Sequence, residues 1–226
     1  MDRLHRTRLL FGDDGVQKLQ KSTVMVVGCG AVGSFAIEAL TRTGIGHLII
    51  VDFDSVDASN INRQLFALES TVGLSKVDVA RARIHDINPD ITVSALNIFF
   101  DENTQLPYSP DYIIDAIDTV DSKIALYRWA DKHDIPLIAS MGAASKTDIT
   151  KIKIDKISKT IVCPLAARVR KLVRENSLPD IPVVYSTQQP VPVMGHAKNL
   201  GSIITVTGTF GLMLANYVVQ EIIQNK

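Results

Sequence analysis

A glycine-rich hexapeptide, Gly28-Cys29-Gly30-Ala31-Val32-Gly33, has the spacing in this sequence that is most suggestive of ligand chemistry. It follows the β-branched run Thr23–Val27 and precedes apolar residues at helical spacing, so we expect it to join a strand to a helix. Free N–H groups and the helix dipole at such a turn attract phosphate. Asp52, about 20 residues further on, can accept hydrogen bonds from ribose hydroxyls. NAD, FAD and ATP fit this pattern equally, and the glycines could also serve a purely structural tight turn.

Two cations downstream suit a triphosphate better than the diphosphate of a dinucleotide. Arg63 and Lys76 could neutralise the extra charge of ATP, which also requires a metal at the strand ends. Lys76 follows Ser75, the expected N-cap of a helix, where the helix macrodipole disfavours a positive charge. This placement favours a bound anion, although solvated surface ions are the alternative for both residues.

The elements that must position these residues alternate between strand and helix. Apolar runs predict strands at Thr23–Val27, Leu48–Val51, Ile91–Leu96, Tyr112–Ala116 and Leu137–Ser140. Helical spacing predicts helices that begin near Val32, run from Ser75 to Asn88-Pro89, and run from Asp121 to His133. Strands joined by such helices are parallel neighbours in a sheet covered on both faces. The predicted fold class is α/β, a Rossmann-like doubly wound, mostly parallel sheet with antiparallel C-terminal additions.

The last third of the chain changes in character. Ile149–Ile154 predicts a strand with outward lysines, and Pro164–Arg174 predicts a basic helix. Four prolines in Asn176–Gly201 predict a long, largely irregular loop. Asn199–Gln220 carries no charge and is long enough to span a bilayer. Its hydroxyl, amide and glycine content argues against stable membrane insertion and favours a buried or subunit-interface segment.

Composition bounds the class of protein. The 226 residues are 46% hydrophobic and 21% charged, which excludes global disorder and predicts a single domain. We divide it into an N-terminal arm (1–21), a nucleotide-binding core (22–142) and a substrate or dimer elaboration (143–226). Basic and acidic residues number 24 each, so overall charge indicates neither nucleic acid nor membrane. Two cysteines and no signal-peptide pattern fit a reducing, cytoplasmic compartment.

Four linked motifs resemble the ubiquitin-activating-like adenylyltransferase superfamily, which includes the ThiF and MoeB proteins. They are DFDSV at 52–56, SNINRQ at 59–64, GLSK at 73–76 and DAID at 115–118. The resemblance implies an adenylate-forming enzyme that uses ATP and Mg²⁺. The implied nucleotide-binding residues are Gly28, Gly30, Ala31, Gly33, Asp52, Asp54, Asn60, Arg63, Gln64, Lys76 and Asp118.

The same resemblance implies individual roles. Arg63 and Lys76 would contact the phosphates, and Asn60 would help to hold the reacting centre. Asp118 would bind Mg²⁺, although an Asp after a strand also commonly caps the following helix. Arg8, which precedes Leu9 and the Phe11-Gly12 pair, would reach the ATP of the neighbouring subunit in a homodimer. The implied catalytic set is Arg8, Asn60, Arg63, Lys76 and Asp118.

Further motifs resemble a narrower family, the tRNA threonylcarbamoyladenosine dehydratases, also called TcdA or CsdL. They include RTGIG at 42–46, INP at 87–89, PLAA at 164–167, YST at 185–187 and TVTGTFG at 205–211. In the implied reaction, the threonyl carboxylate of threonylcarbamoyladenosine in tRNA attacks the ATP α-phosphate and releases pyrophosphate. The substrate's carbamoyl unit then captures the acyl group and releases AMP. The resemblance also admits a monovalent cation and sulfur-transfer proteins as partners.

Two alternatives remain open. One is adenylation of the C-terminal Gly-Gly of a ubiquitin-like sulfur carrier, although members of that type often carry paired C-x-x-C zinc ligands and this chain has none. The other is a nucleotide-sensing module that binds ATP without turnover. Ring closure by the substrate itself needs no enzyme cysteine. We interpret Cys29 as a small filler that faces the nucleotide. For Cys163 two interpretations stay open: a thiol of lowered pKa, or a buried thiol.

Residues 146–174 carry a local charge of +7 within a neutral chain, from nine basic and two acidic residues. The basic ones are Lys146, Lys151, Lys153, Lys156, Lys159, Arg168, Arg170, Lys171 and Arg174. A localised basic segment is what contact with an RNA phosphate backbone requires. A solvated helix and strand face is the alternative.

Overall fold

Seven strands form one mixed sheet in the computed structural model, which describes residues 2–192 and 200–224. The strands are β1 (Thr23–Val27), β2 (His47–Val51), β3 (Thr92–Leu96), β4 (Tyr112–Asp115), β5 (Leu137–Ser140), β6 (Ile152–Lys156) and β7 (Pro182–Ser186). Their order is β3-β2-β1-β4-β5-β7-β6. All neighbouring pairs are parallel except β6 and β7, which are antiparallel. The predicted fold class is therefore confirmed.

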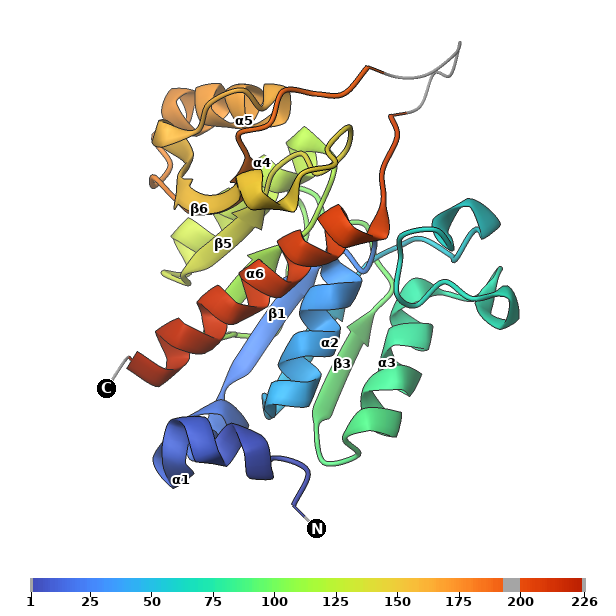
Figure 1. Cartoon of the computed structure of the whole chain (residues 1–226). Helices are drawn as coiled ribbons and strands as arrows, with labels where there is room; N and C mark the ends of the chain where they lie inside the picture. Colours follow the sequence, from blue (N-terminus) through green and yellow to red (C-terminus); the bar gives the residue numbers. More distant parts are fainter. Residues whose placement is uncertain (1, 193–199, 225–226) are drawn as a thin grey trace.

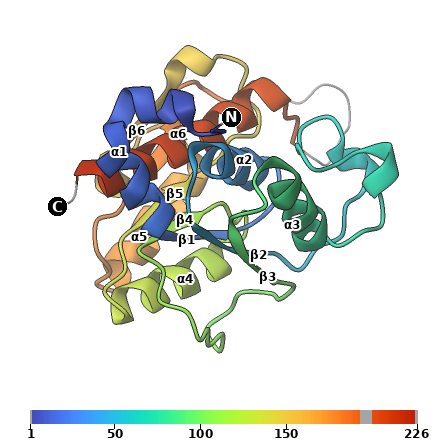
Figure 2. The same cartoon turned by 90° about the horizontal axis from the view of Figure 1, so that it is seen from below.

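Helices cover both faces of this sheet, as Figures 1 and 2 show. They are α1 (His5–Lys21), α2 (Gly33–Thr43), α3 (Lys76–Ile87), α4 (Val120–Lys132), α5 (Pro164–Glu175) and α6 (Ile204–Gln224). Val24 and Val26 of β1 point into the core shared with α2, α3 and α6, whereas Met25 and Val27 point into the core shared with α4 and α5. Because both faces are buried, β1 is apolar at every position after Thr23.

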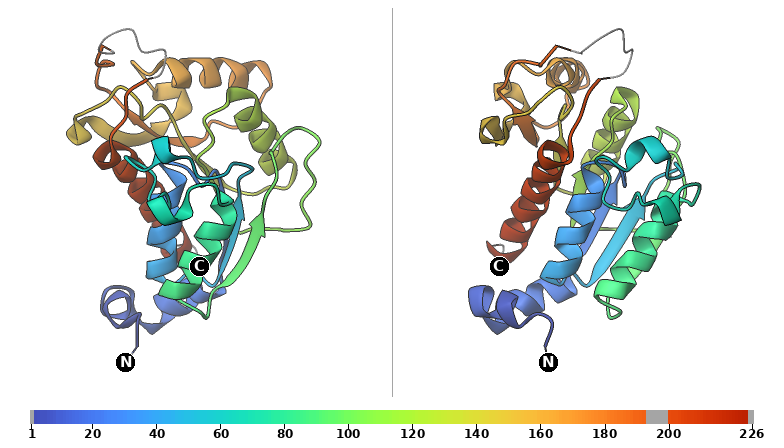
Figure 3. Two further views of the ribbon diagram at one scale, coloured as in Figure 1. Left: turned by 90° about the vertical axis from the view of Figure 1, so that its right-hand side faces the viewer. Right: turned by 45° about the vertical axis from the view of Figure 1, so that its right-hand side comes forward.

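The N-terminal arm expected at residues 1–21 is mostly helical. Gly12 interrupts α1 with a left-handed φ of 69° that an L side chain rarely adopts. The second half of α1 buries Val16 and Leu19, while Leu9 and Leu10 in the first half are exposed. Figure 3 shows α1 at the end of the sheet where the parallel strands begin.

Two expectations for the C-terminal part are corrected in detail. The strand expected at Ile149–Ile154 is a 3₁₀ turn at Ile149–Lys151 followed by β6 at Ile152–Lys156. The segment 176–201 is not irregular throughout, because β7 lies in it and inserts between β5 and β6. Proline is tolerated at the first residue of a strand, and Pro182 occupies that position. Residues 193–199 of this predicted loop lie outside the described residues.

The uncharged C-terminal segment forms most of α6. This helix is long and apolar enough to cross a membrane, with a mean hydropathy of 1.2, yet half of its apolar window is buried within the chain. Its glycines permit close packing on α2: a Cβ on Gly211 would lie 2.3 Å from the Val32 carbonyl oxygen. α6 therefore contributes one face to the core, which is one of the placements that the sequence left open for this segment.

Replacing Gly211 with alanine should destabilise the fold. Alanine gains about 1 kcal/mol of helix propensity over glycine, but the new methyl group meets backbone atoms of α2 that cannot rotate away. Overpacking of this kind costs about 1–3 kcal/mol, so a net loss is expected in urea denaturation. Gly208→Ala is the matched control, because its Cβ would meet only ring atoms of Phe35 at 3.2 Å or more and the ring can shift. Equal stability of both variants and the wild type would contradict the close contact.

Candidate functional site

A cleft of about 570 Å³ lies at the carboxyl ends of the parallel strands. It is centred where β1 has β2 on one side and β4 on the other, the switch point at which open α/β sheets bind ligands. The residues that follow β1, β2, β4 and β5 line it, together with Arg63, Gln64 and Lys76. The fold therefore brings the glycine loop, both predicted cations and Asp118 to one cavity.

The three glycines of the loop have different functions in the fold. A Cβ on Gly28 would lie 2.6 Å from the carbonyl oxygen of Ala116, and one on Gly33 would lie 1.7 Å from that of Gly28. Both positions therefore exclude any side chain. Gly33 does not line the cleft, so its contribution is close packing of α2. Gly30 lines the cleft, and a Cβ there would make only an ordinary 3.7 Å contact with Gln64. Packing within the protein therefore does not require glycine at position 30, which leaves the backbone of the loop open to the cleft.

Cys29 does not face the cleft, which corrects the interpretation from sequence. Its side chain is fully buried in the core, where loss of solvent raises its pKa well above the usual value. The thiol is therefore a neutral packing group. Its backbone N–H donates to Asp52 Oδ2 at 2.6 Å, and the N–H of Asp54 donates to Oδ1 at 2.8 Å. Asp52 thus joins the loops after β1 and β2 at the edge of the cleft.

Lys76 already has an anion within the protein. Its Nζ lies 2.7 Å from Asp54 Oδ2, and its side chain is only 8% exposed at the first residue of α3. Asp54 offsets the unfavourable effect of the helix dipole and of burial on this amine. Ser75 occupies the N-cap as predicted, but its hydroxyl makes no capping bond and has no partner among the described residues.

Arg63 and Asn60 lie in the loop between β2 and α3. Arg63 lines the cleft, with Nη1 donating to the Ser59 carbonyl oxygen at 2.7 Å and to Asn62 Oδ1 at 2.8 Å. Asn60 is buried, and its Oδ1 accepts from the N–H of Asp57 at 3.2 Å. The structure therefore uses the Asn60 side chain to close the loop and does not place it in the cleft.

An apolar wall of the cleft was not predicted. Phe53, Ile98 and Phe99 are half-exposed and line the cleft beside the end of β2. The rings of Phe53 and Phe99 meet edge to face with centroids 4.9 Å apart. Exposed aromatic rings beside a polar phosphate loop suit a flat apolar group such as a base. The run Ile98-Phe99-Phe100 directly after a predicted strand was the sequence signal for this wall.

The opposite wall is built from small residues that sequence reasoning also missed. Ser140, the last residue of β5, lines the cleft together with the four residues that follow it, Met141, Gly142, Ala143 and Ala144. Three of these five residues carry at most a methyl side chain. A glycine followed by two alanines directly after a strand was the available signal.

Arg8 lies apart from the cleft within the chain. It pairs with Asp2 at 3.0 Å and with Asp13. α1, which carries it, lies at the end of the sheet opposite the glycine loop in both views of Figure 3. One chain alone therefore does not complete the predicted catalytic set.

Comparison with known proteins agrees with this geometry. Residues 4–226 match the model of the ThiF family. The tRNA threonylcarbamoyladenosine dehydratase of Bacillus subtilis is 50% identical over 192 residues, which are 83% of this chain and 76% of that protein. The molybdopterin-synthase adenylyltransferase of Escherichia coli is 33% identical over 142 residues, 62% of this chain and 57% of that protein.

Solved structures show the same relationship over nearly the whole chain. The crystal structure of the E. coli tRNA N6-threonylcarbamoyladenosine dehydratase, TcdA, in complex with ATP superimposes with a TM-score of 0.90 at 34% identity. The match covers 97% of this chain and 93% of TcdA. The complex of TcdA with AMP gives a TM-score of 0.91. This chain belongs to the ThiF family and, within it, to the tRNA threonylcarbamoyladenosine dehydratases.

Proposed function

We propose that this chain is an ATP-dependent enzyme that dehydrates threonylcarbamoyladenosine in tRNA through an acyl-adenylate. The observation that carries the proposal is one cleft lined by the open glycine loop, Arg63, Lys76 and Asp118. A phosphate loop alone would suit any nucleotide, whereas two cations and a carboxylate at the strand ends suit a triphosphate and its metal. The ATP complex of TcdA and the names of the relatives support the same reaction.

The lining residues suggest how ATP would lie. The N–H groups of the glycine loop at the start of α2 would hold phosphate oxygens. Arg63 and Lys76 would neutralise charge on the departing pyrophosphate, with Lys76 shared between ATP and Asp54. Asp52 would accept from the ribose, and the wall of Phe53 and Phe99 would cover the adenine.

The donor set fits Mg²⁺ shared with ATP. Mg²⁺ is usually held by one or two carboxylates together with substrate phosphates, and Asp118 supplies one carboxylate to the cleft. Among the described residues no cluster of three or more metal-binding side chains exists, which argues against a site built from protein ligands alone. Bound Mg²⁺ would stabilise charge on the phosphates. Asp118 would hold it in place.

The proposed chemistry has two steps. The threonyl carboxylate attacks the α-phosphorus of ATP, and pyrophosphate leaves. The carbamoyl group of the same substrate then attacks the activated carbonyl carbon, AMP leaves, and the ring closes with net loss of water. Neither described cysteine lines the cleft, because Cys29 and Cys163 are both buried outside it. An intramolecular nucleophile, held close by the substrate itself, fits that arrangement.

A basic face supports tRNA as the substrate. Its residues are exposed and lie on β6, α5 and the turns beside them, near one edge of the sheet in Figure 1: Lys151, Lys153, Lys156, Lys159, Arg168, Lys171 and Arg174. Within the described part of the chain, Lys171 is the only one of them in an ion pair, with Glu175 at 3.7 Å. Cations without internal carboxylate partners are available for phosphate contacts.

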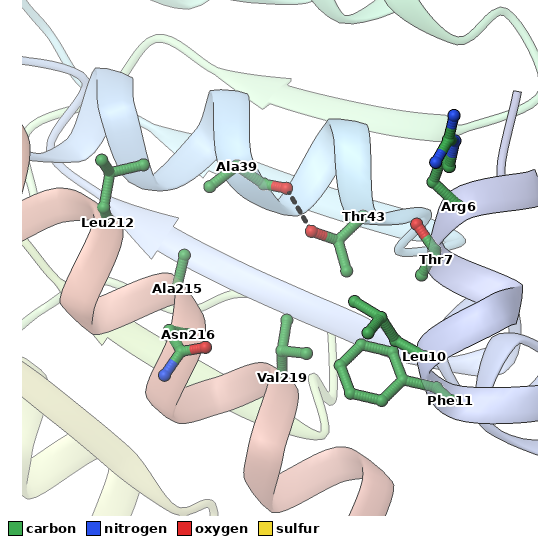
Figure 4. Close-up of a pocket in the computed structure, with 10 residues that line it drawn as sticks. All are labelled: Arg6, Thr7, Leu10, Phe11, Ala39, Thr43, Leu212, Ala215, Asn216 and Val219. Atoms are coloured by element: carbon green, nitrogen blue, oxygen red, sulfur yellow. Dashed lines mark hydrogen bonds between the residues drawn. The ribbon is translucent and has the colours of Figure 1, made fainter.

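A groove between α1, α2 and α6 supports the homodimer (Figure 4). It has a volume of about 360 Å³, and Leu10 and Phe11 of α1 face Val219 of α6 across it. Leu10 is 79% exposed, and Leu212 on the rim is 51% exposed. A second copy of the chain that covers these side chains would remove exposed apolar surface from water.

The proposal has three finer parts. A bound monovalent cation and cooperation with sulfur-transfer proteins rest on family resemblance, whereas a cytoplasmic location rests on the low cysteine content. The monovalent cation is tested by comparing activity in potassium, sodium and choline salts at constant ionic strength. Cooperation with sulfur-transfer proteins is tested by co-purification of those proteins with this chain.

The substrate is tested first by ATP–pyrophosphate exchange. We expect exchange with tRNA that carries threonylcarbamoyladenosine and none with unmodified tRNA. Asp118→Asn keeps the side-chain shape but removes the charge that would hold Mg²⁺, so exchange should fall about 100-fold or more. Asp121→Asn, an exposed acid at the start of α4 outside the cleft, is the control and should keep exchange near the wild-type rate. ATP–pyrophosphate exchange that occurs with a Gly-Gly carrier protein but not with modified tRNA would contradict the proposed dehydratase activity.

Neutralising the basic face should weaken tRNA binding without affecting ATP. Arg168→Ala and Arg174→Ala on α5 should each lower affinity for modified and unmodified tRNA alike, and reduce the slope of log K against log salt by about one where a phosphate contact is lost. Arg81→Ala, an exposed cation on α3 on the other side of the sheet, is the control. An unchanged salt slope in both α5 variants would place tRNA on another surface.

Mixing two inactive variants tests whether Arg8 acts across a dimer. Arg8→Ala and Asp118→Asn should each lose exchange, since they damage different parts of one composite site. If Arg8 serves the partner's cleft, each mixed dimer contains one intact site, and an equimolar mixture should recover about a quarter of wild-type activity after subunit exchange. No recovery, despite mixed dimers shown by native mass spectrometry, would mean that Arg8 does not act in trans.

A further inference from the structure

A buried polar network lies behind the cleft and is not used by the proposed chemistry. Asp115, at the end of β4, and Lys123 and Tyr127, on α4, are each at most 1% exposed. Asp115 Oδ2 accepts from Lys123 Nζ at 2.8 Å and from the Tyr127 hydroxyl at 2.6 Å. None of the three lines the cleft.

The network holds two backbone groups that lie next to the cleft. Asp115 Oδ1 accepts from the N–H of Ile117 at 2.9 Å, and Lys123 Nζ donates to the carbonyl oxygen of Ser140 at 2.8 Å. Ile117 begins the turn that carries Asp118, and Ser140 is the last residue of β5. The same three side chains therefore join the turn after β4 to the small-residue wall after β5.

The turn held by Asp115 also contacts the phosphate loop. The carbonyl oxygen of Ala116 lies only 2.6 Å from where a Cβ on Gly28 would be, and the N–H of Ala116 donates to the Val27 carbonyl oxygen at 2.8 Å. Displacement of this turn would therefore change the position of Asp118 relative to the glycine loop.

We propose that Asp115, Lys123 and Tyr127 are positioning residues that set where Asp118 stands relative to the phosphate loop and the β5 wall. They act through the backbone at Ile117 and Ser140 and do not touch the nucleotide. The inference rests on the proposed function for the role of Asp118 toward Mg²⁺ and ATP.

The positioning role explains why Asp115 and Lys123 carry charges in the core. Replacing a buried ion pair with well-packed apolar residues is often neutral or stabilising, so stability alone does not account for Lys123 and Asp115. A charged carboxylate at the strand end can accept three hydrogen bonds at once and so orient the next peptide. Burial and the charge of Asp115 raise the pKa of Tyr127 well above its usual value, which keeps its hydroxyl protonated as a donor.

Tyr127→Phe is the mildest test because it removes one donor and keeps the ring. ATP affinity would be measured by calorimetry with and without Mg²⁺. We expect the gain in affinity that Mg²⁺ provides to fall about tenfold, the scale of one hydrogen bond to a charged group. Affinity without Mg²⁺, which depends on the glycine loop and the cations, should stay within about twofold. The kcat of exchange with modified tRNA should also fall about tenfold.

Tyr185→Phe is the matched control. Tyr185 on β7 is equally buried, and its hydroxyl has no hydrogen-bond partner in the described chain. Removal of this hydroxyl should change neither the gain in ATP affinity from Mg²⁺ nor the kcat of exchange. The double variant Asp115→Asn, Lys123→Met removes both buried charges together and leaves neither one uncompensated. It should fold, as judged by thermal denaturation, and should also lose the gain in affinity from Mg²⁺.

The outcomes separate this inference from the proposed function. If Mg²⁺ raises ATP affinity in both Tyr127→Phe and the folded double variant as much as in the wild type, the positioning role is overturned. So would an equal loss in Tyr185→Phe, which would indicate a general effect of core substitutions. If the wild type binds Mg²⁺ and ATP but shows no exchange with modified tRNA, the proposed substrate fails, and the affinity measurements still decide the role of the network.

Discussion

Contact between the backbone at Gly28 and the backbone at Ala116 is the constraint on which the cleft depends. The two loops leave neighbouring parallel strands, β1 and β4, at the switch point of the sheet, and no Cβ fits between them at Gly28. No Cβ fits at Gly33 either, because the first turn of α2 packs against the Gly28 carbonyl oxygen. Because the backbones meet directly, the N–H groups at the start of α2 and the turn that carries Asp118 border one cavity.

Several charged groups in and behind this cavity already have partners within the protein. Asp54 holds Lys76, Asp52 holds the backbone of both neighbouring loops, and Asp115 holds Lys123. A buried charge without a partner is costly, and these contacts also hold the charged side chains in fixed orientations. A triphosphate would then enter a site whose cations are already in position, which lowers the cost of reorganisation.

Most of the fold could be predicted from sequence because short apolar runs and helical spacing are local signals. β1, α2 and β2 lie where these patterns placed them, and the glycine loop lies between the first two. β7 was missed because prolines surround it and only its partners β5 and β6 make it a strand. Asn60 was expected to help to hold the reacting centre, and Cys29 was expected to be a small filler that faces the nucleotide. The structure shows that both side chains are used inside the protein.

The sequence by itself determined the class of sheet, the phosphate loop and the set of charged residues that a triphosphate needs, since each depends on residue type and short-range spacing. Only the tertiary structure decided which of those residues share a cavity. Phe53 meets Phe99, and Lys123 joins Asp115 to the Ser140 carbonyl oxygen at the end of β5, because strands distant in sequence are neighbours in the sheet. Arg8 was separated from the cleft for the same reason: α1 packs at the opposite end of the strands. Such contacts follow from packing of both faces of the sheet, which no local pattern encodes.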